Sequence, residues 1–141
     1  IQSALAAIDS IPEVTRTVSL FSLPYLRTIE EDVYSTPYLQ QIPETKEWAQ
    51  TVKQVALHNP LVTGNLLSSD GRVMAINVYF NSQNHSQGRN EKITAALDAA
   101  IGPLKPRLEK VFHIGDPATK TNILSQLRAD QKFILPLAAL V

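Results

Sequence analysis

The feature that most constrains the fold is the stretch Leu61–Phe80, LVTGNLLSSDGRVMAINVYF, because it has the pattern of a β-hairpin. Two runs rich in strand-forming residues flank a turn signal, Ser68-Ser69-Asp70-Gly71. A three-residue loop, 69–71, would place Gly71 at the left-handed position that closes such loops, where a Cβ is costly. The sequence therefore predicts a hairpin with Gly71 at positive φ.

This loop length also fixes the register of the two strands. It pairs Leu66 with Met74 and Val62 with Val78, which makes one face continuously apolar. A two-residue loop would shift every pair by one and place polar residues on that face. A pairing of Leu67 with Met74 would contradict the first register. Because a lone hairpin is only marginally stable in water, we expect helices to cover the apolar face.

Length and composition limit the class of protein. The chain has 141 residues, of which 44% are hydrophobic, so one domain with an ordinary core is expected. Thirteen basic residues balance thirteen acidic ones, which argues against a nucleic-acid partner, since that needs a basic face. The absence of cysteine excludes disulfides, thiolate catalysis and cysteine-bound metals.

The spacing of apolar residues predicts helices and strands on both sides of the hairpin. In order, we expect a helix over 1–10, a strand over 14–23, a helix over 45–57 with Thr45 as its N-cap, the hairpin, a helix that Asn90 caps and Gly102-Pro103 ends, a strand over 109–115, and a helix from Asp116 and Pro117 into 133–141.

Between the first strand and the second helix, the segment Pro24–Pro43 contains three prolines and the acidic run Glu30-Glu31-Asp32. It predicts an irregular excursion with at most a helical turn at Tyr38-Leu39. The element order as a whole predicts an α+β protein: a ferredoxin-like α/β sandwich with a mixed sheet, a central β-hairpin covered by helices, and a C-terminal linker helix.

The search for chemistry finds no motif that requires a catalytic or binding role. The histidines lack metal-ligand spacing, the serines near Asp70 are explained by the turn, and the acidic run lacks a calcium loop. No phosphate loop or dinucleotide fingerprint occurs. We therefore predict no catalytic, cofactor-binding or metal-binding residues and no enzymatic activity. The residues considered and set aside are His58, His85, His113, Ser68, Ser69, Asp70, Glu30, Glu31, Asp32, and the glycosylation-like triplet Asn84-His85-Ser86.

The aromatic residues Trp48, Phe80 and Phe112 stand at positions typical of a core. A core role is therefore expected for them in preference to a binding platform.

Three stretches, taken together, resemble a known family. They are VTRTVSLFSL at 14–23, the hairpin stretch at 61–80, and HIGDPATKTNILSQLRADQKFILPLAALV at 113–141. In this order they resemble the first periplasmic segment of RND-superfamily exporters of the MMPL-like, patched-like branch. The residues that match its G-x-P turn, its helix with an internal Asp and its Pro-Leu exit into the membrane are Gly115, Pro117, Asp130, Pro136 and Leu137. The segment 24–57 carries no matching motif.

The resemblance implies a division of the chain and a function. Residues 1–132 would form an extracytoplasmic porter-type domain, with 24–58 as an excursion that holds one helix, and 133–141 would begin a transmembrane helix. The whole protein would be a proton-driven efflux transporter of the bacterial inner membrane, with this segment facing the periplasm. The implied partners are the other transmembrane and periplasmic parts of that transporter, the membrane through flanking helices, and hydrophobic or lipid-like cargo. The family's proton-relay carboxylates lie in later membrane helices, so no residue of this chain inherits that role.

The alternative is a free-standing soluble α+β module for ligand binding or interaction, and a homo-oligomer is an option in either case. The apolar run Phe133–Val141 separates the two hypotheses. Its nine residues span less than half of a bilayer, which needs about 20. A free module should bury this run in its own core, whereas a porter domain should continue it into the membrane.

Overall fold

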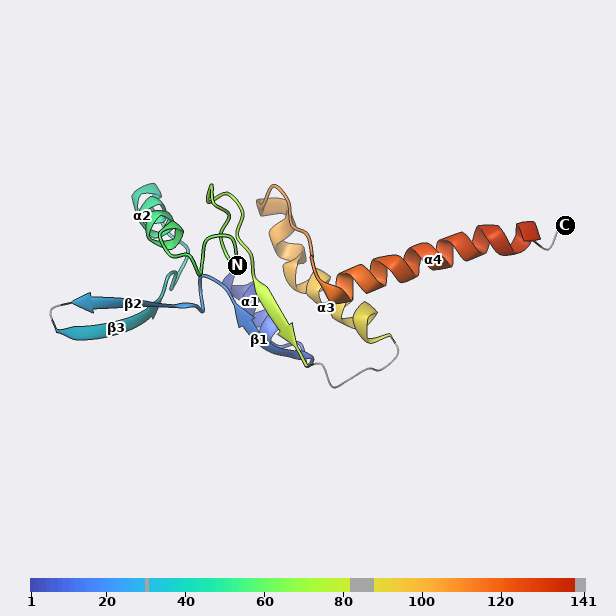
Figure 1. Ribbon diagram of the computed structural model, residues 1–141, viewed down its shortest axis with the longest axis horizontal. Coiled ribbons are helices and arrows are strands. Elements are labelled where there is room, and N and C mark those ends of the chain that lie inside the picture. Colours follow the sequence, from blue (N-terminus) through green and yellow to red (C-terminus); the bar gives the residue numbers. More distant parts are fainter. Residues whose placement is uncertain (30, 82–87, 139–141) are drawn as a thin grey trace. The chain divides into compact units, whose positions relative to one another are not determined.

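The computed structural model describes residues 1–29, 31–81 and 88–138 (Figure 1). The chain divides into two compact units. The terminal unit comprises Ile1, Ser3–Glu13 and Asn81–Val141, and the central unit comprises Gln2 and Val14–Phe80. The elements are α1 (Gln2–Asp9), β1 (Val14–Val18), β2 (Pro24–Ile29), β3 (Asp32–Pro37), α2 (Lys46–Leu57), β4 (Asn77–Phe80), α3 (Arg89–Ile101), the 3₁₀ helix η1 (Gly102–Arg107) and α4 (Asp116–Ala138).

The fold class is α+β, as the sequence predicts. The strands of the described residues form two separate two-stranded sheets, β1–β4 and β2–β3, and both are antiparallel. The prediction of one mixed sheet is therefore wrong. The ferredoxin-like arrangement stays a prediction.

The first sheet pairs β1 with β4, from Val14 opposite Phe80 to Val18 opposite Asn77. The predicted strand over 14–23 ends early, at Val18. Two serine side chains bond the backbone locally at this point: Ser22 Oγ accepts from Ser19 N at 2.9 Å, and Ser19 Oγ accepts from Phe21 N at 3.2 Å. Such local bonds favour a turn over continued strand pairing.

The predicted hairpin over 61–80 is wrong in its first arm. Residues 61–67 form successive turns, because the carbonyl oxygen of Asn59 accepts from Val62 N and Thr63 N, and Asn59 Oδ1 accepts from Leu61 N. Val62 and the adjacent pair Leu66 and Leu67 are all buried. Two neighbouring residues of a strand face opposite sides, so an alternating strand with one covered face would not bury both.

The predicted register is also wrong by one residue, since Leu67 forms the bridge with Met74. The turn itself is confirmed, because Gly71 has φ +62°. Asp70 Oδ1 accepts from Ser68 Oγ at 2.5 Å and from Arg72 N at 3.0 Å. These bonds lower the pKa of the Asp70 carboxyl below its ordinary 3.8, with the Ser68 bond as the largest cause.

The segment expected to be irregular, Pro24–Pro43, contains the hairpin β2–β3, with Pro24 opposite Pro37 and Ile29 opposite Asp32. The two prolines lie at the outer ends of the strands, where a missing N–H costs the sheet little. Tyr38 and Leu39, predicted as a helical turn, form no helix and are buried in the core, and Leu39 N donates to Leu20 O at 3.0 Å.

The core of the central unit lies between α2 and the turns of 61–67. Val52 and Val55 of α2 and Met74 are packed against its buried residues. Thr45 caps α2 as predicted, with its Oγ1 accepting from Trp48 N at 3.2 Å. The buried residues of this core are Leu20, Tyr38, Leu39, Ala56, Val62, Leu66 and Leu67.

In the terminal unit, α3 ends at Ile101, before Gly102 and Pro103 as predicted, and the chain continues as η1. The predicted N-cap Asn90 lies inside α3, and Gly88 at φ +77° occupies the cap position instead. Ile93, Ala100 and Ile101 are buried. The apolar stripes of α3 and α2 also predict contact with the sheet expected to contain Ile76 and Val78, and this stays a prediction for Ile93, Leu97, Ile101, Trp48 and Val52.

The strand predicted over 109–115 is wrong. Residues 110–114 form no strand, and no backbone hydrogen bond joins them to another part of the described chain. Phe112, expected in the core, is exposed, and so is Ile114. Helix α4 then starts at Asp116, whose carboxylate pairs with Lys120 Nζ at 2.6 Å one turn later.

Candidate functional site

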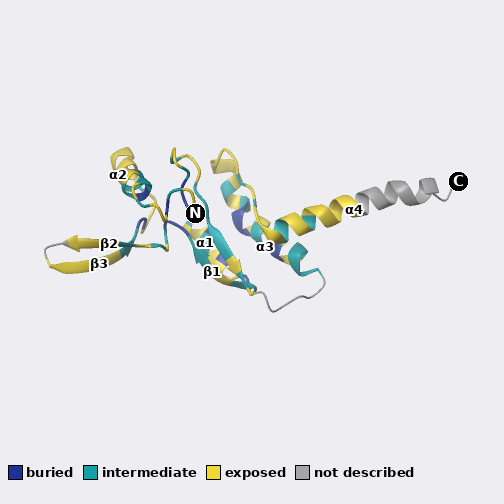
Figure 2. Ribbon diagram, in the orientation of Figure 1, coloured by how far each residue is buried: buried dark blue, intermediate teal, exposed yellow. Residues whose placement is uncertain are grey.

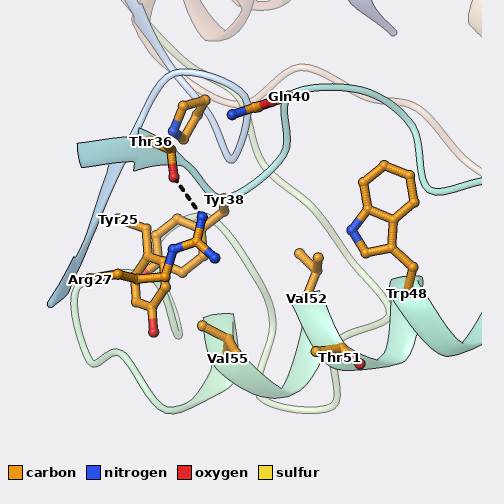
Figure 3. A pocket seen from close by; sticks show the side chains of 10 residues that line it. Tyr25, Arg27, Thr36, Tyr38, Gln40, Trp48, Thr51, Val52 and Val55 are labelled. Atoms are coloured by element: carbon orange, nitrogen blue, oxygen red, sulfur yellow. Dashed lines mark hydrogen bonds between the residues drawn. The ribbon is translucent and has the colours of Figure 1, made fainter. Parts of the chain in front are cut away.

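The central unit contains a groove of about 360 Å³ between the β2–β3 hairpin and α2 (Figure 3). It is built entirely from the segment 24–57 that carries no family motif. The residues that line it are Tyr25, Arg27, Thr36, Pro37, Tyr38, Gln40, Trp48, Thr51, Val52 and Val55.

The hairpin supplies one wall through strand alternation. Tyr25 and Arg27 lie on the same face of β2, and Thr36 lies opposite Tyr25 on β3. The ring of Tyr25 packs against that of Tyr38 with centroids 4.9 Å apart and planes tilted by 35°. Asn59 Nδ2 donates to the Tyr38 hydroxyl at 2.6 Å, which ties this aromatic pair to the buried core.

Helix α2 supplies the opposite wall. Trp48, Thr51, Val52 and Val55 follow the spacing i, i+3, i+4, i+7, which places them on one face of the helix. Trp48, Val52 and Val55 are half-buried, so their apolar surface is partly open to the groove. The sequence predicts that the apolar stripe of α2 packs against the sheet. In the structure, part of that stripe lines the groove instead.

Arg27 is the only charged side chain in the lining. Its Nη2 donates to Thr36 Oγ1 at 3.1 Å, and its guanidinium carbon lies 5.7 Å from the Tyr25 ring centroid. No carboxylate within the described ranges forms an ion pair with it. Figure 3 shows the guanidinium in front of the tyrosine rings. The groove therefore presents one cation beside apolar walls.

The lining combines apolar surface with one cation and several hydroxyl groups. It contains the hydroxyls of Thr36 and Thr51 and the phenolic hydroxyls of Tyr25 and Tyr38, and the lining holds no carboxylate and no imidazole that could act as a general base beside them. Nor do three or more metal-ligating side chains gather anywhere in the part of the chain that the structure describes.

The residues singled out from the sequence are not brought together. His58 ends α2, with its Nδ1 2.7 Å from Gln54 O, and His113 lies in the irregular segment, with Nε2 buried and unpartnered among the described residues. Asp32 begins β3, and Ser68 and Asp70 hold the turn. Glu30, His85 and the triplet 84–86 lie outside the described residues.

The sequence does not point to the groove residues, because the prolines and acidic residues of Pro24–Pro43 predict an irregular loop instead of the observed hairpin. A signal was present, since PYLRTI and DVYSTP both contain strand-forming residues on either side of a short polar turn. Trp48 was assigned to the core from helical spacing alone, and spacing does not distinguish a core face from a groove wall.

A second surface lies on α4. Beyond Thr121 every described side chain of this helix is exposed, including Ile123, Leu124 and Leu127, which are 50%, 39% and 53% exposed (Figure 2). The apolar spacing of Ile123, Leu124 and Leu127 in the sequence predicts that these three residues dock the helix to the domain, and their exposure shows that this prediction is wrong. The helix meets α3 at its start, where Thr121 Oγ1 lies 3.4 Å from Thr94 Oγ1.

Within the ranges that the structure describes, no helix has the length and apolarity needed to cross a membrane. Comparisons of the chain with protein-family models, with curated proteins and with solved structures found no match.

Proposed function

We propose that this chain is an extracytoplasmic, porter-type domain of a proton-driven RND-type efflux transporter in the bacterial inner membrane, which moves hydrophobic or lipid-like cargo. The ordered resemblance of the stretches 14–23, 61–80 and 113–141 supports this proposal. The observation that carries it is the exposed apolar side of α4.

Ile123, Leu124 and Leu127 stand at i, i+1 and i+4, so they share one side of the helix. Such a contiguous apolar surface normally marks an interaction with a protein or a membrane. The helix leads into the apolar run Phe133–Val141, which gives this surface a natural continuation. A membrane-proximal linker helix accounts for both features.

A linker of this length could couple the domain to the membrane. Helix α4 has 23 residues, which corresponds to about 35 Å at 1.5 Å per residue. In such a transporter, rocking of membrane helices would be passed along the helix to the domain, and cargo would pass as the domain moves. The domain would contribute passage and binding, while proton transfer occurs elsewhere in the protein.

Flotation with phosphatidylcholine vesicles tests the proposal against the alternative of a free-standing soluble module. The full chain should rise with the vesicles, and a chain that lacks 133–141 should stay at the bottom of the gradient. The emission of Trp48 should be the same for both chains, and their circular dichroism should differ only by the helical residues of α4 that the deletion removes. Ile114→Gln, which changes an exposed apolar residue outside α4, is the matched control and should float like the full chain.

Two outcomes would overturn the proposal. If the full chain does not float, the apolar run is not a membrane segment. If the shortened chain unfolds, the run belongs to the core, and the soluble module becomes the better hypothesis.

A further inference from the structure

We propose that the groove between the β2–β3 hairpin and α2 binds a small amphipathic organic anion. The planar apolar body of this ligand would lie between the two tyrosines on one side and Trp48 and the valines of α2 on the other, and its carboxylate, sulfonate or phosphate group would bind Arg27. The inference goes beyond the proposed function and is argued from residues 24–57 alone, so the two proposals can fail separately.

The size and lining of the groove favour a small, largely apolar ligand. Its volume of about 360 Å³ lies at the lower end of the range for small-molecule sites. Three aromatic residues and two valines supply apolar surface from both sides: Tyr25, Tyr38, Trp48, Val52 and Val55. Because aromatic rings prefer offset or tilted contacts with one another, a flat aromatic body suits these walls.

The charge of the groove favours an anion. A guanidinium has five N–H donors, and the hydrogen bond to Thr36 uses one of those on Arg27. An anionic oxygen pair could take two of the remaining donors in the bidentate geometry that arginine favours. Since no described carboxylate pairs with Arg27, an incoming anion would not have to displace an internal partner.

The position of Arg27 favours a defined orientation of the ligand. The Thr36 hydroxyl and the Tyr25 ring hold the guanidinium at the edge of the apolar walls. A ligand with its anionic group at Arg27 would direct its apolar body toward Trp48 on α2. Thr36 is therefore a positioning residue for the cation.

Two dyes with the same aromatic skeleton test the charge requirement. 8-Anilinonaphthalene-1-sulfonate carries a sulfonate, and N-phenyl-1-naphthylamine lacks it. Trp48 is the only tryptophan of the chain, so quenching of its emission during titration of the full chain reports binding close to the groove. The sulfonate dye should quench Trp48 at lower concentration than the neutral dye.

Substitutions then separate charge from shape. Arg27→Gln should weaken binding of the sulfonate dye about five- to tenfold and leave the neutral dye unchanged. Thr36→Val keeps the charge of Arg27 but removes the hydrogen bond that positions its guanidinium. It should weaken binding of the sulfonate dye by less than Arg27→Gln does, and leave binding of the neutral dye unchanged. Thr51→Tyr adds bulk to the helix wall and should weaken both dyes. Arg107→Gln removes an equal charge from η1, in the terminal unit, and should change neither.

Three results would overturn the inference. The first is an equal loss for both dyes in Arg27→Gln, which would leave an apolar groove without charge selection. The second is a loss in Arg107→Gln as large as that in Arg27→Gln, which would indicate a response to net charge. The third is dye fluorescence that rises while Trp48 emission stays constant, or that is unaffected by Thr51→Tyr, which would place the dye elsewhere.

Discussion

Replacing Leu67 by alanine distinguishes the observed turns of 61–67 from the alternating strand that the sequence predicts. In the predicted register, Leu66 lies on the covered face and Leu67 on the opposite, mixed face. In the structure both are buried, and Leu67 is only 8% exposed. Leu67→Ala should therefore cost as much stability as Leu66→Ala, although the two residues are adjacent.

The magnitude follows from the burial of the side chain. Leu→Ala substitutions in cores cost about 2–5 kcal/mol, and the small remaining exposure of Leu67 places its cost near the lower part, about 2–3 kcal/mol. Domains are typically stable by about 5–15 kcal/mol, so the variant should remain folded at 25 °C. Leu61, in the same segment, is 72% exposed, and Leu61→Ala should change stability by less than about 0.5 kcal/mol.

Urea unfolding followed by Trp48 emission is the appropriate assay, because Trp48 belongs to the same central unit. The midpoints of Leu66→Ala and Leu67→Ala should both fall clearly below that of the unchanged chain, with Leu61→Ala as the matched control. The reasoning is refuted if Leu67→Ala behaves like Leu61→Ala while Leu66→Ala is strongly destabilised. That pattern is the signature of an alternating strand.

Three further predictions concern the turn and the terminal unit. Gly71→Ala should lower the free energy of unfolding by about 1–2 kcal/mol in urea, because φ is +62° and a Cβ would also overlap Lys53 Cε. Gly64→Ala, at φ +83° with open space around it, should cost less stability. An equal cost for the two variants would exclude a role for Lys53. The Asp70 carboxylate, whose pKa is lowered in the folded state, contributes stability that is fully present above its unfolded pKa of 3.8 and is lost as the pH falls through the lowered folded value. Asp70→Asn should remove this part of the dependence of stability on acid pH. The prediction is contradicted if the variant and the unchanged chain give the same acid unfolding curve. Ile93→Ala, at a buried position of α3, should lower the free energy of unfolding by about 2–5 kcal/mol, measured by thermal circular dichroism. Phe112→Ala, at an exposed position, should lower it by less than about 0.5 kcal/mol. Similar losses of stability for the two variants would refute the assignment of Ile93 to the core.

Local signals predicted several elements correctly. Thr45 followed by a stripe at helical spacing located α2, and the pair Gly102-Pro103 located the end of α3. Gly71 in a polar turn was predicted at positive φ, as observed. Each of these features depends on the backbone preferences of a few neighbouring residues, which are present in the sequence itself.

The candidate site could be predicted only in part. The stripe of α2 was identified, but the hairpin that faces it was not, because Pro24, Pro37 and the acidic residues between them are typical of loops. The observed hairpin places those prolines at the ends of its strands, where they do little harm to the sheet. A groove also requires two elements to stand apart by a fixed amount, and periodicity along one element carries no information about that distance.

The sequence by itself determined the α+β class, the helices α2 and α4, the start of the first strand, and the turn at Gly71, because short-range spacing and capping dictate them. Tertiary structure decided which segments pair. β4 joins β1 although the chain between them is long, and the residues expected to pair with β4 fold into turns that bury Val62, Leu66 and Leu67 together. The physical reason is that strand pairing and burial depend on which apolar surfaces meet in three dimensions. A local pattern can supply a strand or a turn, but the partner that covers it is chosen by the packing of the whole unit.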